Sequence, residues 1–492
     1  MSGSARMKRR WIMSVALSLI LAVLAGTSPG ETARPHLVII SIDGLVPAYY
    51  VRPDRWGLRI PHLRQLRRQG AYAEGVIGVY PSVTYPSHTT IITGALPADH
   101  GIVANTIFDE PTKPPTRRWY WQAAFIKVDT LWAAARRAGL RVASVGWPVT
   151  VEAQEIDWNL PEIWDPFAPR SAFPAPFRKY STPGLIERVL KWAKKTTSDY
   201  RPNDDFRVDA AVYLIEQMKP HLLLVHLIDL DGTQHRYGPY SDQAFQMTEK
   251  QDARVGRLLE ALRRAGLLSS TTVAIVSDHG FMRIDKLFNP GVALVRAGLI
   301  QLDERGRVKS WAAAIHSNGG SAAVYLREPE NRSVALKVEK LFRAYAGPQG
   351  LPLRQILTRQ QLDRYGANPR AFLFLEAASH YGLTAKLRGP LIEDAPPGVR
   401  GKHGYLPDRP EMYASLILWG RGVRARRHRE LARMVDIAPT FARLLHIEFR
   451  PPAYSRPLTD MIRSVRRKEM KSGPAVHTSS LPLTEGYRSG LR

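Results

Sequence analysis

Four uninterrupted apolar runs constrain the fold of this chain more than any other feature of its sequence. They are HLVIISIDG (residues 36–44), HLLLVHLIDLDG (221–232), TTVAIVSDHG (271–280) and YASLILWG (413–420). A strand that is apolar on both faces suits a parallel sheet covered by helices on both sides. Amphipathic helical stretches lie between the runs, so strand and helix alternate along most of the chain. The sequence therefore predicts an α/β fold with a doubly wound, mostly parallel sheet and helices on both faces.

Two stretches interrupt this alternation. Residues 160–206 are rich in Pro, aromatic and charged residues and predict an irregular excursion over the surface. Residues 285–400 hold short strand and helix patterns, which predict a smaller α+β insertion. The main domain would then comprise residues 35–284 and 401–447, and residues 463–492 predict a mobile basic tail.

The first 28 residues have the pattern of an export signal. A basic segment ending at Arg10 precedes the apolar run WIMSVALSLILAVLA, and small residues follow at 25–28. This run of about 15 apolar residues is shorter than the roughly 20 needed to span a membrane, so an uncleaved anchor is the alternative. We expect an exported protein, periplasmic or secreted.

The formal net charge of +26 is the extreme feature of the composition. Such a field attracts nucleic acid, anionic surfaces and anionic small substrates. Many of the arginines lie on predicted helical faces, where they are most simply solvated, and no basic motif with interleaved aromatic residues indicates sequence-specific nucleic-acid recognition. We expect a small anionic substrate, with membrane contact only through the N-terminal segment or through attraction to an anionic surface. The chain has no Cys, which excludes disulfides and a lipid-modified cysteine.

Acidic and histidine side chains gather where the apolar runs end, and a further histidine follows in GKHGY. Ligands bind outside the carboxyl ends of the strands in open α/β sheets. Each residue alone has an ordinary explanation as a turn or a cap, but together they predict a divalent-metal site. Three Asp and three His can complete two zinc-like sites. These residues are Asp43, Asp231, His235, Asp278, His279 and His403.

The segment PSVTYPSHTTIITGALPADHGI (81–102) contains a candidate nucleophile. Pro86 is favourable in the first turn of a helix, which leaves Thr84 at or just before the helix N-terminus. The positive end of a helix favours a nearby anion there. Thr84 is therefore either an ordinary N-cap residue or a hydroxyl directed at a phosphate, and the second interpretation depends on the metal site.

Taken together, these motifs resemble the nucleotide pyrophosphatase/phosphodiesterase family of the alkaline phosphatase superfamily, from about His36 to Leu445. The matching motifs are Asp231…His235 followed by RYGP, SDHG at 277–280, HGY at 403–405 and the segment VTYPSHTTIITGALPADHGIVANTIFD. The resemblance implies an alkaline phosphatase-like core. It also implies hydrolysis of phosphodiester or pyrophosphate bonds through a phospho-threonine intermediate, with two Zn²⁺ ions per chain.

The resemblance also implies roles for individual residues. One zinc site would be formed by Asp43, Asp278, His279 and the Thr84 oxygen, and the other by Asp231, His235 and His403. Asn105 would hydrogen-bond a non-bridging phosphate oxygen. Tyr85 would lie against a nucleobase, and Trp164 would supply the opposite face of that clamp.

Two motifs depart from the family pattern. The acidic-Pro-Asp run is here IDLDGTQH, without the Pro, and HGYDN is replaced by HGYLPD. Both changes keep the ligands and leave the substrate preference open. A sulfatase would need a Cys or Ser in a modification motif, and there is no Cys. A phosphate-monoester hydrolase, a phosphotransferase acting on lipid or glycan head groups, and a basic surface-binding protein on an inactive scaffold remain alternatives. Asn105, in place of extra cationic groups, favours diesters.

Overall fold

The computed structural model of this protein describes residues 34–114, 116, 118–163, 175–196, 203–348 and 350–463. Within this part of the chain, no helix combines the length and apolar character needed to cross a membrane. The predicted export signal, Trp164 and all but the first residue of the predicted tail lie outside the described residues.

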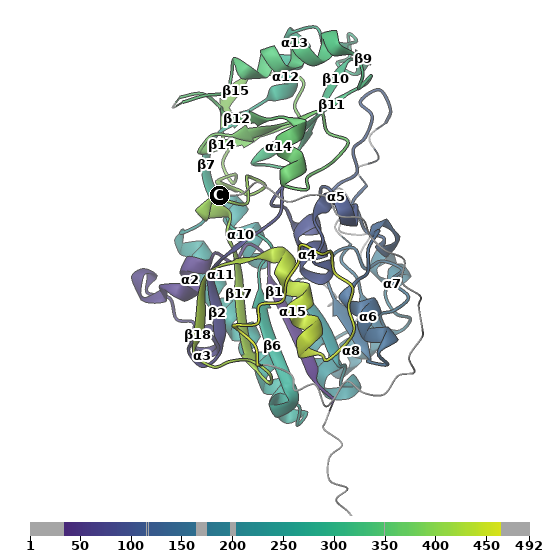
Figure 1. Ribbon diagram of the computed structural model, residues 1–492, viewed down its shortest axis with the longest axis vertical. Coiled ribbons are helices and arrows are strands. Elements are labelled where there is room, and N and C mark those ends of the chain that lie inside the picture. The colour runs from purple at the N-terminus through teal and green to yellow at the C-terminus, as the bar shows by residue number, and fades with distance from the viewer. Residues whose placement is uncertain are drawn as a thin grey trace, which may run out of the picture.

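A central eight-stranded sheet organises the molecule (Figure 1). β1 pairs in parallel with β5 and β6, and β3 pairs in parallel with β5 and β4. β17 is antiparallel to both of its neighbours. The predicted doubly wound, mostly parallel sheet is therefore confirmed. In spatial order the strands are β18 (Arg427–Arg433), β2 (Ala71–Ile77), β17 (Ala414–Gly420), β6 (Thr271–Val276), β1 (His36–Ile42), β5 (Leu222–Leu227), β3 (Val142–Val145) and β4 (Trp158–Leu160).

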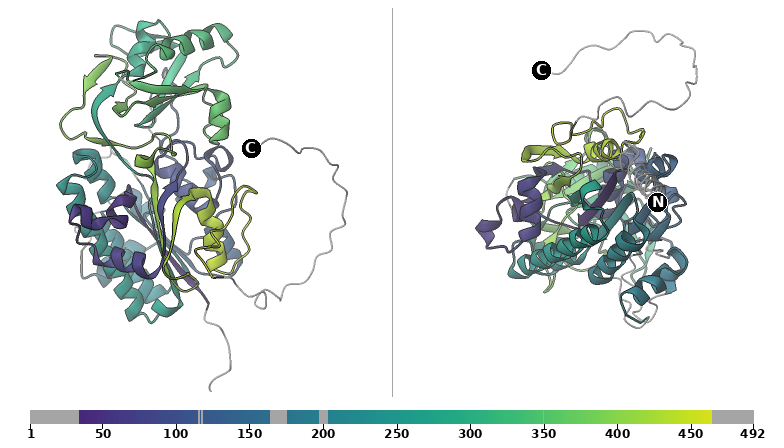
Figure 2. Two further views of the ribbon diagram at one scale, coloured as in Figure 1. Left: turned by 60° about the vertical axis from the view of Figure 1, so that its left-hand side comes forward. Right: turned by 90° about the horizontal axis from the view of Figure 1, so that it is seen from below.

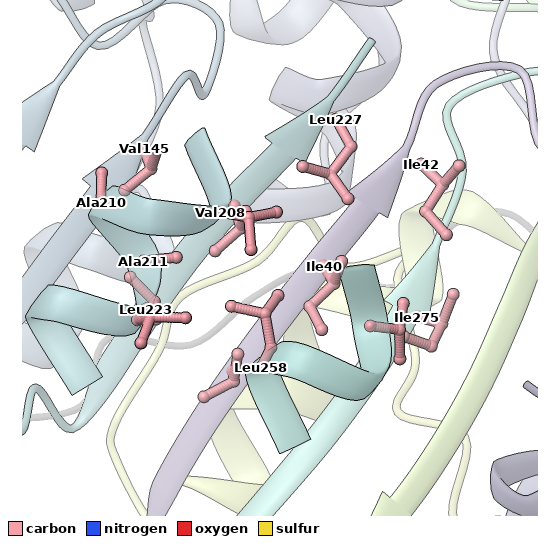
Figure 3. Close-up of a cluster of buried hydrophobic side chains, with 14 of the residues drawn as sticks. Ile40, Ile42, Val145, Val208, Ala210, Ala211, Leu223, Leu227, Leu258 and Ile275 are labelled. Atoms are coloured by element: carbon pink, nitrogen blue, oxygen red, sulfur yellow. The ribbon is translucent and has the colours of Figure 1, made fainter. Parts of the chain in front are cut away.

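The apolar runs are unbroken because both faces of their strands are buried. In β1, Ile40 and Ile42 pack into a hydrophobic cluster on one face, whereas Leu37 and Ile39 pack into a second cluster on the other face. Figure 3 shows the first cluster, where Ile40 lies with side chains from neighbouring strands and from the helices that cover them. Alternating side chains of one strand thus contribute to two cores.

Helices cover both faces of this sheet, as predicted. The first cluster includes side chains of α2 (Pro47–Val51), α3 (Pro61–Gln69), α7 (Ala175–Tyr180), α8 (Leu185–Trp192), α9 (Asp204–Tyr213) and α11 (Asp242–Arg264). The second cluster includes side chains of α4 (Thr84–Thr93), α6 (Leu131–Arg137) and α15 (Ile437–Leu444). The remaining helices of this part are α5 (Pro97–His100) and α10 (Asp229–Tyr237). Short 3-10 or π turns lie at Pro53–Trp56, Ala123–Phe125, Leu214–Met218, Leu268–Ser270, Pro410–Met412 and Met434–Asp436.

Residues 285–400 form smaller sheets with their own helices, which lie at one end of the central sheet (Figures 1 and 2). The α+β character matches the expectation, and the domain bounds stay a prediction. One sheet has the order β10 (Ala313–Ser317), β11 (Ser321–Leu326), β13 (Leu373–Ala377) and β12 (Leu353–Leu357). The others comprise β14 (His380–Leu383), β7 (Met282–Phe288), β15 (Ile392–Asp394) and β16 (Gly401–Lys402), and β8 (Ile300–Leu302) with β9 (Val308–Trp311). The helices are α12 (Pro290–Arg296), α13 (Arg332–Arg343) and α14 (Arg359–Arg364).

The pairing of β7 with β16 joins this region to the central domain. Gly401 pairs with Arg283, and Lys402 pairs with Met282, in antiparallel register. The chain therefore leaves the central domain and returns to it at adjacent positions.

Candidate active site

A cavity of about 810 Å³ opens beside the carboxyl ends of the central strands. The structure places Asp278 and His279 fully buried at the end of β6. The predicted site residues among the described residues that line the cavity are Asp43, Thr84, Tyr85, Asn105, Asp231, His235 and His403.

The strand order explains why these residues converge. Asp43 directly follows β1, which lies between β5 and β6. Because these three strands are parallel, their carboxyl ends meet at one edge of the sheet. The chain after β5 enters α10, where Asp231 and His235 are four residues apart and share one helix face.

The insertion does not separate His279 from His403. His279 precedes β7 and His403 follows β16, and these two strands are paired. The two imidazole rings stack with centroids 3.6 Å apart. A residue more than a hundred positions further along the chain is thus returned to the same edge of the sheet.

Two groups of ligand atoms could each hold a metal ion. One comprises Asp231, His235 and His403, as predicted, and the other comprises Asp43, Asp231 and His279; within each group the ligand atoms lie within 4.8 Å of one another. Asp231 therefore belongs to both groups. Asp278, which was predicted in the first site, places its Oδ2 atom 3.1 Å from Nε2 of His279. All six predicted ligands lie at one place.

Backbone carbonyls orient the three ligand histidines. Nδ1 of His235 lies 2.9 Å from the carbonyl of Gly401. The carbonyls of Ser82 and Gly280 are similarly close to Nδ1 of His403 and of His279. A carbonyl oxygen only accepts, so each Nδ1 carries a proton and each ring turns Nε2 toward the cluster. This arrangement is typical of histidines that ligate a metal.

Four atoms at the centre are buried without a hydrogen-bond partner among the described residues: Asp43 Oδ1, Asp231 Oδ1, Asp278 Oδ2 and His279 Nε2. The Nε2 atom of His279 lies 3.4 Å from Oδ1 of Asp43. The lone pairs of the neighbouring carboxylate oxygens repel one another unless a cation lies between them. The donor set of carboxylate oxygen and imidazole nitrogen fits zinc or a similar divalent ion.

The pKa shifts of these residues also reflect the close spacing of buried ionisable groups. Burial, together with the charges of Asp278 and Asp231, raises the pKa of Asp43 well above its usual value. Burial would also raise the pKa of Asp278, but nearby imidazoles and the N–H of Gly44 hold it below its usual range. Burial lowers the pKa of His235 to about 3, which keeps this ring neutral at pH 7. Neutral imidazoles and closely spaced carboxylates favour a bound cation.

Thr84 is the first residue of α4, and the N-cap residue is Val83, which makes no side-chain capping hydrogen bond. The N-cap interpretation of Thr84 is therefore wrong. Pro86 is the third residue of the helix and lies in its first turn, as expected. Pro is tolerated there because the first four N–H groups of a helix have no partner within the helix. Thr84 is 9% exposed and lines the cavity, at the positive end of a ten-residue helix.

Asn105 is oriented by the same helix end. Its Oδ1 atom accepts a hydrogen bond of 2.9 Å from the N–H of Tyr85. The amide NH₂ group, which is a donor only, is what remains for the cavity. A donor at this place suits an anionic oxygen.

The aromatic clamp differs from the expectation. Tyr85 borders the cavity, but its side chain is 0% exposed. Trp119 packs on it with ring centroids 5.2 Å apart, also lines the cavity and is half-buried. Trp164 lies outside the described residues. Trp119 was not predicted from the sequence, although the aromatic run WYW was an available signal; it pairs with Thr106 as an isolated bridge.

A row of polar side chains that begins at Asp43 was not predicted from the sequence either. His226 lies inside the apolar strand β5 and contacts Asp43, and Glu162 and Arg207 continue the row. The signal was present, because an imidazole in the middle of an apolar run needs a buried partner.

Comparisons with known proteins agree with this geometry. Residues 37–405 match the family model for type I phosphodiesterase/nucleotide pyrophosphatase. Human ectonucleotide pyrophosphatase/phosphodiesterase family member 1 is 26% identical over 255 residues, which are 51% of this chain and 24% of that protein. The bis(5′-adenosyl)-triphosphatase of Xenopus laevis is 27% identical over 277 residues, 55% of this chain and 52% of that protein. The chain thus spans about a quarter and about half of these relatives.

Solved structures show the same fold. Human ectonucleotide pyrophosphatase/phosphodiesterase 5 is 20% identical and superimposes with a TM-score of 0.62, covering 88% of this chain and all of that chain. An inactive threonine-to-alanine variant of the murine protein, in complex with AMP, has a TM-score of 0.59 at 20% identity and covers 85% of this chain and 96% of that chain. Since the family model spans more than half of its residues, this chain belongs to the type I phosphodiesterase/nucleotide pyrophosphatase family of the alkaline phosphatase superfamily.

Proposed function

We propose that this chain is a two-zinc phosphodiesterase and nucleotide pyrophosphatase that works through a phospho-threonine intermediate. The observation that carries the proposal is the set of four unpartnered ligand atoms in one cluster, with Thr84 lining the same cavity. Asp231, His235 and His403 would hold one ion, and Asp43, Asp278, His279 and Thr84 the other. The inactive threonine variant of a structural relative supports the role of Thr84.

The bound ions would supply Lewis-acid chemistry, which offsets phosphate charge and favours the ionised hydroxyl. The Thr84 oxygen forms a bond to phosphorus, and the bond to the leaving oxygen breaks in line. The positive end of α4 and the amide N–H groups of Asn105 bind the non-bridging oxygens. Removing one such donor costs about 10²-fold in rate in comparable sites. Water then cleaves the phospho-threonine bond and returns the free hydroxyl.

A nucleobase would stack on Trp119, whose half-buried ring lines the cavity. Tyr85 supports that ring from behind, and Trp164 remains a candidate for the opposite face. AMP bound to the murine relative and the dinucleotide triphosphatase among the curated relatives both support a nucleotide substrate.

The test is metal content together with a comparison of substrates. The purified protein should contain about two zinc ions per chain and lose activity on chelation. The kcat/KM for an aryl phosphodiester should exceed that for the matching monoester by at least about tenfold, because the extra charge of a monoester costs a few kcal/mol when it is not balanced. A protein without metal whose activity resists chelation would refute the proposal.

The monoester alternative depends on one cationic side chain. Of the described residues that line the cavity, Arg236 is the one Arg or Lys, and its guanidinium lies 5.3 Å from the ring centroid of Tyr237. If monoesters were the better substrates and Arg236→Gln removed that preference, the phosphatase alternative would replace the diesterase. Equal turnover of phospholipid or glycan diesters with transfer to an acceptor would indicate the phosphotransferase. The inactive, surface-binding alternative predicts no zinc and no turnover.

Export remains a proposal that rests on the sequence of residues 1–28. N-terminal sequencing of the mature protein from a fractionated cell distinguishes cleavage near residue 28 from retention of the segment as an anchor.

A further inference from the structure

A continuous row of buried polar side chains begins at Asp43, and its third member, Glu162, also lines the cavity. Oδ2 of Asp43 lies 3.0 Å from Nε2 of His226, and Nδ1 of His226 lies 3.0 Å from Oε2 of Glu162. Nη2 of Arg207 donates to the same Glu162 oxygen at 3.0 Å, and Nη1 donates to the carbonyl of His226 at 2.8 Å. None of the four residues is more than 6% exposed.

The row fixes one oxygen of Asp43 and leaves the other to the cation cluster. Oδ2 accepts from His226, whereas Oδ1 has no partner among the described residues and faces Nε2 of His279. A carboxylate held at one oxygen cannot rotate to present the other oxygen elsewhere. Both nitrogens of His226 face carboxylate oxygens, which only accept, so both carry protons and the ring cannot reverse without losing both bonds.

The other ligands are held differently. The three ligand histidines use backbone carbonyls, and Oδ1 of Asp278 accepts from the N–H of Gly44. Backbone partners are the same whatever the side chain, whereas the partner of Asp43 depends on the identity of residues 226, 162 and 207. Asp43 also belongs to only one of the two ligand groups. A substitution in this row should therefore change cation binding at the ligand group that contains Asp43 and not at the other group.

We propose that His226, held by Glu162 and Arg207, is a positioning residue that orients Asp43 and sets the affinity of one of the two cation groups. The inference rests on the proposed function, because it assumes that the groups hold zinc. His226 is not itself among the residues that line the cavity, although its partners Asp43 and Glu162 are, and it acts through Asp43.

The experiment is stepwise removal of zinc from the loaded protein by a chromophoric chelator, for the wild type and for His226→Leu. Partners that orient a ligand typically contribute 10–100-fold to metal affinity. We expect His226→Leu to lower the affinity for one zinc ion by about that factor and to leave the affinity for the other within about twofold of wild type. The His226→Gln variant retains a donor that can reach Asp43 and should recover part of the affinity.

The matched control is His100→Leu. His100 is also 0% exposed, and its ring has hydrogen-bond partners in the Thr90 hydroxyl, the backbone of Pro86 and the N–H of Ile102, none of which is a predicted metal ligand. It should lose stability comparable to that of His226→Leu and keep both zinc affinities. If both histidine variants weakened both ions equally, His226 would have only a structural role and the inference would be wrong.

A second variant covers the case in which His226→Leu does not fold. Glu162→Gln keeps the size of the side chain but replaces one carboxylate oxygen that holds His226, so the same single zinc ion should weaken by several-fold. Unchanged affinity for both ions in Glu162→Gln would overturn the inference. Absence of zinc from the wild type would refute the proposed function instead, so the two failures are distinguishable.

Discussion

A buried carboxylate in the small sheet and the carboxylate cluster at the end of the central sheet differ in whether their oxygens have hydrogen-bond partners. In the small sheet, Glu376 accepts from the N–H of Leu406 and from Arg409 through one oxygen, and from the hydroxyl of Tyr80 through the other. At the end of the central sheet, Asp43 and Asp278 each retain an oxygen with no hydrogen-bond partner among the described residues.

The difference separates a structural role from a functional one. A buried carboxylate whose oxygens are all bonded has no capacity for a ligand and stabilises the local fold. A cluster with unpartnered oxygens costs stability in the empty protein and is retained where a cation or substrate completes it. Glu376 and Asp278 are both 0% exposed, so burial alone does not distinguish them.

The largest effect should come from the hydroxyl beside the unsatisfied cluster. Thr84→Ala should lower turnover of an aryl phosphodiester by at least about 10³-fold, because loss of a nucleophile cannot be compensated by binding. Thr84→Ser should retain part of the activity. Thr89→Ala is the matched control on the same helix, since the Thr89 hydroxyl donates only to the carbonyl of Tyr85. Near wild-type turnover in Thr84→Ala would contradict the covalent mechanism.

The next effect should appear in the metal content. Asp278→Asn replaces a carboxylate that has an unpartnered oxygen and should lose about one of two zinc ions, whereas Glu376→Gln should keep both. Metal analysis of the two purified variants, with circular dichroism to check folding, makes the comparison. Equal zinc loss in both would show that the clusters do not differ as described.

The pH dependence of stability tests the satisfied cluster. Burial raises the pKa of Glu376 to about 7, despite Arg409, whereas the unfolded carboxyl titrates near 4.5. The folded state therefore holds the proton more tightly, and stability is fully present below about pH 4.5 and is lost as pH rises through about 7. The shift corresponds to about 3 kcal/mol. Urea unfolding at pH 5 and pH 8 should show this loss in the wild type relative to Glu376→Gln; parallel values would contradict it.

The smallest effect concerns the aromatic wall of the cavity. Trp119→Ala should raise KM for a nucleotide diester by roughly 5- to 100-fold and change KM for a small aryl diester less, because base stacking contributes about 1–3 kcal/mol. Steady-state kinetics on both substrates measure the difference. Equal losses on both would remove base stacking from the proposal and favour lipid or sugar diesters.

Most of the fold followed from the sequence because a parallel sheet leaves a strong local signal. β1, β5 and β6 are buried on both faces, and their apolar runs mark them without reference to any partner strand. The ligands followed for a related reason, since Asp43 and Asp278 directly follow their strands. His403 was predicted from the motif GKHGY, but its return to the cluster depends on the pairing of β7 with β16, which no local pattern predicted.

The remaining features depend on contacts between distant segments. Trp119 reaches the cavity through a bridge to Thr106 in a loop that has no periodicity. The contact between His226 and Asp43 depends on the register of β5 against β1, in which His226 lies opposite Ser41. Local sequence patterns do not encode that register, so the row behind Asp43 is visible only in three dimensions.

The short ladder of β7 and β16 also bears on how such enzymes diversify and can be rebuilt. The chain leaves and re-enters the central domain at paired residues, so the two ends of the segment between Met282 and Lys402 are fixed next to each other. This segment is called the cassette below. Its length can change at little entropic cost, about 0.6 kcal/mol for each doubling of a flexible loop. A transplanted cassette would have to preserve that two-residue pairing, the hydrogen bond from Ser321 to the carbonyl of Gly404, and the hydrogen bonds that Glu376 accepts from Tyr80, Leu406 and Arg409. Cassette exchange would therefore change the part of the molecule at one end of the central sheet and leave the six predicted ligands, none of which lies between Met282 and Lys402, in place.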